Sequence, residues 1–424
     1  MDAIVSSDVV EPPSPDWAFL PEEILNLILN QLIQLSDYVR FGAVCKSWQA
    51  VGLLQKVKRR CEIHKQVPML LVRAPAKKNH RRSLYSIGTQ NTVLDFQAEV
   101  LYSRRSLYSI TQNKVLDFQV EFPYSQRCRG CSFGWLTTVE KDTSIKLVNP
   151  FSGGKTIRLP PVVQSCDADD NEYEYRVHKV VLSSNPSLTP DDFVALALYG
   201  GCNNLAYIKP GQACWTYIDK FGKLFLDAIY HRGKFYAVAH NCGVIAFDPS
   251  CGSTGTEPPQ VTEVLPRTED GDEYGDMVYI MESASGEDLL LVQRFIDENS
   301  NDYPNDAMTA EFKIFKLLGV DGCEKCLLQR VEINSLGGDA LFLGNNDSLC
   351  VSASNFPGCQ PNCIYYTDDY IDKEFEKPFG PLDTGIYSLE DKSIRKHYRL
   401  KARHTRRRAL HGLPLLIWIV PTLS

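Results

Sequence analysis

The sequence predicts an α+β multidomain protein in which a small three-helix unit precedes a mainly-β domain, with a β-propeller as the first choice for that domain. Apolar residues recur at helical spacing from residue 20 to residue 57. Beyond residue 80, short apolar and aromatic runs alternate with turn residues, which is typical of strands. Several pairs of runs share one plan and end in Asn-Pro or Asp-Pro, as in residues 134–154 and 233–250. Recurring antiparallel hairpins favour a radial or barrel-like sheet, in which closure removes exposed edges.

Length and composition are those of a soluble protein with more than one folded unit. The chain has 424 residues, 44% of them apolar and 23% charged, so it can bury a core and exceeds what one core usually covers. Its net charge of -7 provides no overall field that would attract nucleic acid or an anionic membrane. The N-terminus has no signal-peptide pattern, and no apolar run is long enough to span a bilayer. We therefore expect a protein partner, no nucleic acid and no membrane.

Composition shifts along the chain predict the boundaries between its parts. Three prolines in an acidic segment indicate a mobile leader, and a basic, proline-punctuated stretch after the helical region indicates a connector. One tandem repeat, in which a second copy follows the first almost residue for residue, predicts a duplicated hairpin that either extends a blade or protrudes. The predicted parts are a disordered leader at 1–16, the helical unit at 17–57, a linker at 58–80 and the β domain at 81–424, with repeat copies at 81–103 and 104–125.

The first predicted helix has an unusually wide apolar face. At ~100° per residue its apolar positions cover roughly 240° of arc, whereas an apolar stripe little wider than ~100° is enough for a surface helix to cover its own core. These positions are Leu20, Ile24, Leu25, Leu27, Ile28, Leu29, Leu32 and Ile33. One side of the helix therefore needs a further cover, for which another chain and the β domain of the same chain are equally compatible with the pattern.

Local signals place the ends of the three helices. Pro21 suits the first turn, where its missing N–H costs nothing, and two glutamates follow near the positive end of the helix dipole. Ser36 and Asp37 offer an N-cap for a second helix. A third helix is indicated by Val44, Trp48 and Val51, which recur at helical spacing.

The helical unit resembles the F-box family. Its Leu-Pro start, its acidic and aliphatic positions and its Val-Cys-Lys-x-Trp sequence match the family's signature, with Asp37 and Arg40 at the family's inter-helix positions. In that family these helices dock on a Skp-type adaptor, which links to a cullin and thereby to a ubiquitin-conjugating enzyme. The resemblance implies that the adaptor is bound by Leu20, Pro21, Glu23, Ile24, Leu25, Ile28, Leu32, Val44, Cys45, Lys46 and Trp48.

The β domain resembles the KIB-type β-propeller that follows the F-box in a large group of plant proteins. The matching segments include GWLTTV at 134–139, GKFYAV at 233–238 and the block from 339 to 391. The family's terminal Pro-Ile-Trp-x-x-Pro is echoed by Leu416, Ile417, Trp418 and Pro421. This resemblance implies a platform that recruits a protein substrate whose identity is unknown.

Several short motifs could suggest a metal, phosphate or catalytic site, but a structural explanation fits each of them better. Cys128 with Cys131, and Cys323 with Cys326, have the spacing of half a zinc site, but neither pair has a second pair nearby. The segment 153–156 (GGKT) lacks the first glycine and the following helix of a phosphate-binding loop. Acidic clusters near 167–170 and 269–273 lie among turn residues and are expected in solvated loops. We therefore expect no catalytic constellation, no metal and no cofactor.

Together these patterns predict the substrate-recognition subunit of a Skp–cullin–F-box (SCF) E3 ubiquitin ligase, without catalysis of its own. The alternative is a binding protein that inhibits or sequesters a partner such as a kinase without degradation. A remoter alternative is a propeller enzyme, such as a hydrolase, which requires several carboxylates converging on the central channel. The basic run at 403–408 (RHTRRR) has the composition of either a nuclear import signal or an exposed basic face, and we expect the protein in nucleus and cytoplasm.

Overall fold

The chain divides into two compact units, one over residues 1–63 and one over 64–422. The computed structural model describes residues 17–32, 35–59, 67–73, 102–123, 127–140, 144–152, 155–162, 177–200, 203–218, 224–250, 259–267, 275–297, 308–319, 327–369, 383–396 and 416–421.

The first unit is helical, as the sequence predicts. Its elements are η1 (Trp17–Phe19), α1 (Glu22–Gln31), α2 (Leu35–Gly42) and α3 (Lys46–Arg59). α2 starts at Leu35, so Ser36 and Asp37 lie inside the helix rather than at its N-cap. Arg40 lies in the same helix and pairs with Asp37 at 2.9 Å, one helical turn away, so the expected inter-helix placement of these two residues is wrong.

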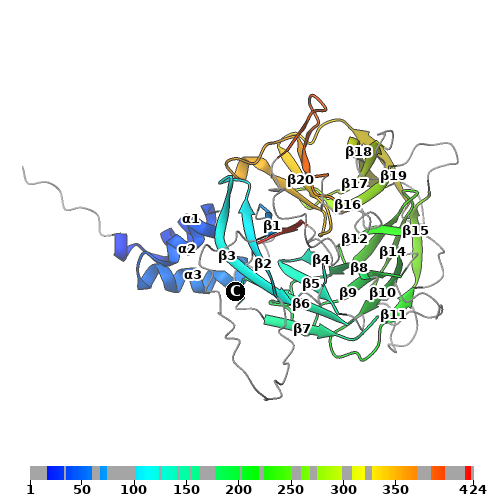
Figure 1. Cartoon of the computed structure of the whole chain (residues 1–424). Helices are drawn as coiled ribbons and strands as arrows, with labels where there is room; N and C mark the ends of the chain where they lie inside the picture. Colours follow the sequence, from blue (N-terminus) through cyan, green and yellow to red (C-terminus); the bar gives the residue numbers. More distant parts are fainter. Residues whose placement is uncertain are drawn as a thin grey trace, which may run out of the picture. The chain divides into compact units, whose positions relative to one another are not determined.

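The second unit is a six-bladed β-propeller in the described part of the chain, which confirms the predicted fold class (Figure 1). Each blade is an antiparallel sheet of four strands, except the sixth, which has five strands and one parallel pairing. Blade 1 contains β25 (Ile417–Ile419), β1 (Met69–Arg73), β2 (Tyr102–Ser109) and β3 (Lys114–Pro123). Blade 2 contains β4 (Arg127–Ser132), β5 (Trp135–Val139), β6 (Ile145–Asn149) and β7 (Lys155–Leu159). Blade 3 contains β8 (Val177–Leu182), β9 (Ala195–Tyr199), β10 (Asn204–Ile208) and β11 (Thr216–Ile218).

The other three blades complete the ring. Blade 4 contains β12 (Phe225–His231), β13 (Lys234–Ala239), β14 (Val244–Phe247) and β15 (Val261–Leu265). Blade 5 contains β16 (Met277–Glu282), β17 (Leu289–Asp297), β18 (Met308–Gly319) and β19 (Leu328–Ile333). Blade 6 contains, in spatial order, β21 (Leu349–Ser352), β20 (Asp339–Leu343), β22 (Cys363–Tyr366), β23 (Gly385–Ser388) and β24 (Ile394–Arg395), with the short helix η3 (Ala353–Asn355) after β21.

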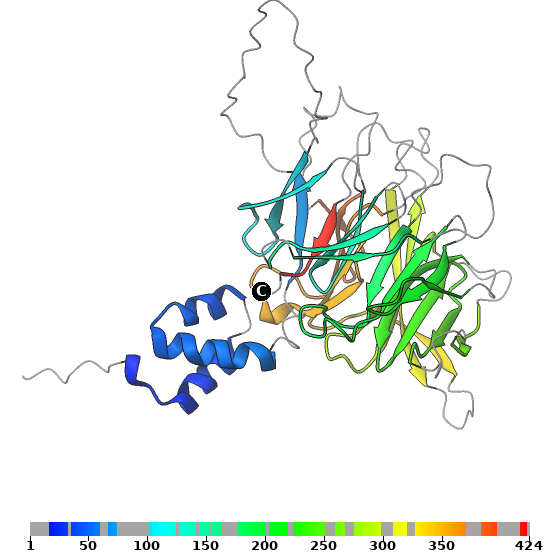
Figure 2. The same cartoon turned by 90° about the horizontal axis from the view of Figure 1, so that it is seen from below.

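The ring is closed by strands from opposite ends of the second unit. β25, near the C-terminus, pairs antiparallel with β1, placing Ile417 opposite Leu71, and Figure 2 shows the two strands side by side. Trp418 of β25 is fully buried, and its indole N–H donates a 3.0 Å hydrogen bond to the carbonyl of Leu343 in blade 6. The terminal strand therefore joins the first blade to the last and closes the ring.

Apolar side chains fill the space between neighbouring blades. Six buried clusters lie one at each blade interface, including the interface between blades 6 and 1, where Phe342 and Trp418 meet edge to face at 5.2 Å. Several strands are buried on both faces, and β9 and β14 are accordingly continuous apolar runs rather than alternating ones. Burial between blades is the principal source of the unit's stability.

Two hairpin turns show how the sequence sets the strand ends. Arg232 and Gly233 join β12 to β13 with φ of 47° and 86°, and Phe133 and Gly134 join β4 to β5 with φ of 49° and 76°. Two successive residues with positive φ form the two-residue turn whose twist matches that of antiparallel strands. Glycine at the second position removes the steric cost there.

The structure revises the expected start of the β domain. Residues 69–73, in the stretch predicted as a linker, form β1, because the apolar run Met69-Leu70-Leu71-Val72 pairs on both sides with β2 and β25. The basic residues and prolines around this run are typical of a linker, so the sequence did not predict the strand. The second repeat copy supplies most of the β2–β3 hairpin of blade 1, whereas residues 81–101 of the first copy lie outside the described residues.

Candidate functional site

The apolar arc of α1 is divided between the unit's own core and the solvent. Leu25 and Leu29, one turn apart, are buried and pack with Phe41 of α2 and Val51 of α3. On the wheel, Ile24 and Leu27 lie on a different face, and they are 42% and 60% exposed. The helix therefore carries a second apolar face beyond the one that builds its own core.

The sequence-predicted adaptor residues fall into three groups in the helical unit. Leu25 is buried. Leu20, Ile28, Leu32, Cys45 and Trp48 are half-buried, and four of them border the core cluster. Pro21, Glu23, Ile24, Val44 and Lys46 are exposed. Leu25 therefore cannot contact a partner directly, and it can contribute to a binding surface only by packing beneath the exposed residues.

Besides Leu27, three large apolar residues that are exposed in the described part of this unit were not among the predicted contacts. Trp17 and Phe19 of η1 are 60% and 82% exposed, and Leu53 of α3 is also exposed. The signal in the sequence was the aromatic pair directly before Leu20-Pro21, but aromatic residues alone do not distinguish a core position from a surface one.

Trp48 connects α3 to η1. Its indole N–H donates a 2.9 Å hydrogen bond to the carbonyl of Trp17, and its ring lies 4.6 Å from that of Phe41. Pro21 is the N-cap of α1, and its carbonyl accepts from the amides of Ile24 and Leu25, each at 3.1 Å. These contacts fix the entry of the chain into α1.

A polar cluster lies at the inner wall of the propeller. The inner strands contact one another around the ring, β25 with β4, β4 with β8, β8 with β12 and β12 with β16 (Figure 1). Lys179 of β8 forms a buried ion pair with Asp227 of β12. Asp227 also accepts hydrogen bonds from the amides of Ala228 and Ile280 at 2.7 and 3.2 Å and from the hydroxyl of Ser348 at 2.6 Å. All of these partners compensate the burial of one carboxylate.

The loop 344–348 between β20 and β21 completes this cluster. Although it belongs to blade 6, Ser348 reaches Asp227 in blade 4, and Asp347 reaches blade 2. The amide of Asp347 donates to the carbonyl of Cys131 at 2.9 Å, and its carboxylate accepts a short hydrogen bond from Ser132. The loop therefore latches non-adjacent blades together across the inner wall.

Asp227 is not available as a general acid or base. Both oxygens of Asp227 are engaged by Lys179, Ser348 and backbone amides. A general acid or base needs a free proton site within reach of a substrate, and Asp227 has none. The contacts of Asp227 are therefore structural and join blades 3, 4, 5 and 6.

Burial raises the pKa of Asp347 to about 7, although Lys179 and the hydrogen bond from Ser132 act in the opposite direction. The residue as a whole is partly exposed, but its Oδ1 is buried and has no protein partner. Because this pKa lies above the ordinary value of 3.8, the folded protein holds a proton that the unfolded chain releases. The resulting stability is fully present below about pH 4 and is lost as the pH rises through about 7.

We expect Asp347→Asn to flatten part of this pH dependence. Asparagine can still accept from Ser132 but carries no charge, so the variant should gain stability relative to the wild type between pH 5 and pH 8, on the order of a few kcal/mol. Thermal unfolding of both proteins at pH 5 and at pH 8 gives the change in stability of each. Other titrating groups contribute equally to both changes, so the difference between them reports on Asp347. An equal loss of stability in both proteins between pH 5 and pH 8 would contradict this role of Asp347.

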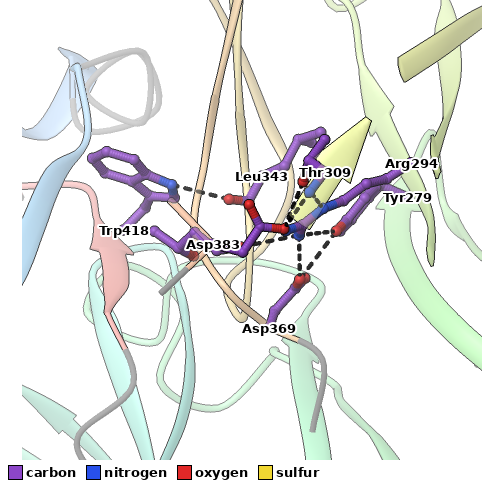
Figure 3. Close-up of polar contacts among 8 residues, drawn as sticks. Tyr279, Arg294, Thr309, Leu343, Asp369, Asp383 and Trp418 are labelled. Atoms are coloured by element: carbon purple, nitrogen blue, oxygen red, sulfur yellow. Dashed lines mark hydrogen bonds and ion pairs between the residues drawn. The ribbon is translucent and has the colours of Figure 1, made fainter. Parts of the chain in front are cut away.

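A second buried network joins blades 5 and 6 (Figure 3). Arg294 of β17 is fully buried and pairs with Asp369 at 2.8 Å and with Asp383 at 2.6 Å. It also donates to the hydroxyl of Thr309 at 2.8 Å and to that of Tyr279 at 3.2 Å. Burial raises the pKa of Asp369 to about 6, against the opposing effect of Arg294. Asp369 follows β22 and Asp383 precedes β23, so both ends of the connection between these strands are bound to the Arg294 guanidinium.

The cysteine pairs do not gather metal ligands in the described part of the chain. Cys128 and Cys131 both lie in β4, and burial raises the pKa of the Cys131 thiol well above its usual range. No group of three or more metal-ligating side chains occurs among the described residues. Cys323, Cys326, the acidic clusters, Gly153, Gly154 and the basic run lie outside them.

Comparison with protein families decides the identity of the larger unit. The model of the KIB1-4 beta-propeller matches residues 107–388. The chain belongs to this family. An F-box-like model matches residues 17–55, which cover η1, α1, α2 and most of α3. The KIB1-4 beta-propeller thus follows an F-box, an arrangement consistent with a substrate-recognition adaptor.

F-box proteins of Arabidopsis thaliana align with most of the length of this chain. F-box protein At4g35733 of Arabidopsis thaliana is 23% identical over 88% of this chain and 94% of its own length. Putative F-box protein At1g65770 of the same plant is 26% identical over 88% of this chain and 95% of its own length. Among the described helices, none is long and apolar enough to cross a membrane.

Proposed function

We propose that this chain is the substrate-recruiting subunit of an SCF E3 ubiquitin ligase. The observation that carries the proposal is the second apolar face of α1, where Ile24 and Leu27 stay exposed although Leu25 and Leu29 already fill the unit's core. An exposed apolar surface of this kind marks a site of protein interaction. In an F-box the partner that fits is a Skp-type adaptor.

The proposed mechanism is proximity. The F-box anchors the chain to the adaptor and cullin, the propeller holds a protein substrate, and the conjugating enzyme on the cullin transfers ubiquitin to a lysine of that substrate. The chain contributes effective concentration and orientation rather than a reacting group. We propose nucleus and cytoplasm as the sites of action.

The alternative is inhibition or sequestration of a bound protein without degradation, with the F-box serving assembly only. The two functions differ in the fate of the bound protein. In the alternative, the abundance of that protein would not depend on the proteasome.

The test is to purify the full chain from plant cells with and without proteasome blockade. We expect a Skp-type adaptor and a cullin to co-purify, and proteins captured by the propeller to accumulate when the proteasome is blocked. Quantitative mass spectrometry of the captured proteins measures both. Absence of adaptor and cullin would reject the ligase, whereas their presence with captured proteins of unchanged abundance would favour the non-degradative alternative.

A further inference from the structure

The chain carries two nearly identical segments for one hairpin of blade 1. Residues 104–125 supply most of the β2–β3 hairpin, and residues 81–103 repeat them with four substitutions and one inserted residue, Gly88. The substitutions place Thr92, Ala98, Val100 and Leu101 where the second copy has Lys114, Val120, Phe122 and Pro123. Two segments of such similarity are expected to prefer the same structural environment.

The buried contacts of the hairpin come from positions that both copies share. Ser106, Leu107, Tyr108 and Ser109 of β2 are each at most 6% exposed. Leu107 lies opposite Leu71 of β1, and Tyr108 lies opposite Leu70. The first copy repeats these four residues in the same order, as Ser83, Leu84, Tyr85 and Ser86. Over residues 106–116, where the structure describes the side chains, only the exposed Lys114 lacks an identical counterpart.

The hydrogen bonds of the turn are also encoded in both copies. The hydroxyl of Tyr108 donates a 2.6 Å hydrogen bond to Oδ1 of Asn113, and the amide of Gln112 donates a 3.2 Å hydrogen bond to the hydroxyl of Ser109. Asn113 has a φ of 48°, which asparagine adopts more readily than most residues. The first copy offers the same groups in Tyr85, Ser86, Gln90 and Asn91.

The inserted glycine gives a reason why the second copy occupies the blade. Gly88 lengthens the turn by one residue, at a place where the observed turn packs closely on the segment between η3 and β22. A Cβ added at Gly358 of that segment would lie 3.0 Å from the carbonyl oxygen of Thr111. A longer turn has to shift at this contact, so the first copy fits blade 1 less well than the second.

The connections of the blade allow one copy to replace the other. β2 pairs antiparallel with both β1 and β3, so the β1–β2 and β3–β4 connections leave the blade at the same end. These connections are residues 74–101 and 124–126. With the first copy in the blade, residues 74–80 would precede it and residues 104–126 would follow it. Chain length moves from one connection to the other, and the loop entropy changes little because it depends on the logarithm of length.

We propose that residues 81–103 are a second occupant of blade 1 and can replace residues 104–125 against β1. The propeller then has two arrangements with the same ring, which differ in the copy that pairs with β1 and in the copy that extends from the end of the blade. The second copy predominates because its turn is shorter. The exchange needs no partner other than the chain itself, so it is independent of the proposed ligase. It lets the fold tolerate damage to either copy.

The test is hydrogen exchange of the full chain and of variants with a charge at the shared leucine. Peptides of the two copies differ in mass, because the first contains Gly88 and Thr92. Leu107→Asp puts a carboxylate into the buried contact with Leu71, so the first copy should take the place of the second. We expect amide protection to fall by at least ~10-fold over residues 104–112 and to rise by a similar factor over 81–90.

The double variant Leu84→Asp/Leu107→Asp leaves neither copy suited to the blade. Its melting temperature should lie at least ~5 °C below that of Leu107→Asp, whereas Leu84→Asp alone should melt as the wild type does. Melting of Leu107→Asp at the temperature of the double variant, without protection gained over 81–90, would overturn the proposal. A loss of stability in Leu84→Asp alone would overturn it as well, since the first copy would then already be part of the fold.

Two deletions test the same exchange without introducing a charge. A chain that lacks residues 81–103 and a chain that lacks residues 104–125 each keep one copy. Both should fold, with melting temperatures within ~5 °C of each other, because either copy completes blade 1. A chain without residues 104–125 that does not fold, beside a folded chain without residues 81–103, would show that the first copy cannot occupy the blade.

Discussion

Replacing Arg294 with methionine is expected to lower the free energy of unfolding of the β-propeller by ~3–5 kcal/mol. Methionine fills much of the same volume, so the loss comes from the charge and its hydrogen bonds rather than from a cavity. Asp369 and Asp383 would stay buried without their cation, and the hydroxyls of Thr309 and Tyr279 would lose a donor. Buried carboxylates without compensation are among the most destabilising features of a folded protein.

The measurement is chemical unfolding of the full chain, followed by pulsed hydrogen exchange in peptides of the β unit. Lys392→Met is the control, because Lys392 pairs with Glu311 at 2.7 Å but is 71% exposed, and its loss should leave the unfolding midpoint nearly unchanged. Equal midpoints for the Arg294 variant and the wild type would contradict the proposed clamp between blades 5 and 6.

The helical unit illustrates how far sequence patterns reach. Helical spacing and the F-box signature were enough to predict three helices and a partner surface on the first. The pattern could not separate Leu25 from Ile24, since both are aliphatic and lie within one wide arc. Only the packing of α2 and α3 decides which of them is buried.

The β unit shows which features have no local signal. Turn residues and apolar runs predicted antiparallel hairpins and a propeller, but the number of blades depends on pairings such as that of β25 with β1, which lie at opposite ends of the unit. The latch from Ser348 to Asp227 spans 121 residues, and the ion pair of Arg294 with Asp383 spans 89. Contacts of this range depend on the closed ring rather than on neighbouring residues.

The second large effect is expected at the exposed face of α1. Replacing Ile24 and Leu27 together with aspartate should weaken adaptor binding by at least ~100-fold, because docking would have to bury two charges in an apolar contact. The fold should survive, since both side chains are exposed and an acid at position 24, in the first turn, complements the helix dipole.

A buried neighbour in the same helix provides the opposite control. Leu29→Ala should destabilise the helical unit by ~2–5 kcal/mol, since Leu29 is fully buried in its core. The exposed face itself would be chemically unchanged, so adaptor binding by the folded fraction should persist. The two variants thus separate loss of the surface from loss of the fold.

The most direct measurement is calorimetric titration of a purified Skp-type adaptor against the full-length wild type and the Ile24→Asp/Leu27→Asp variant, with circular dichroism to verify that both are folded. We predict tight binding by the wild type and loss of binding by the folded variant. Equal affinity of the two proteins, or no binding by either, would contradict the claim that this face of α1 docks the chain onto a ubiquitin ligase.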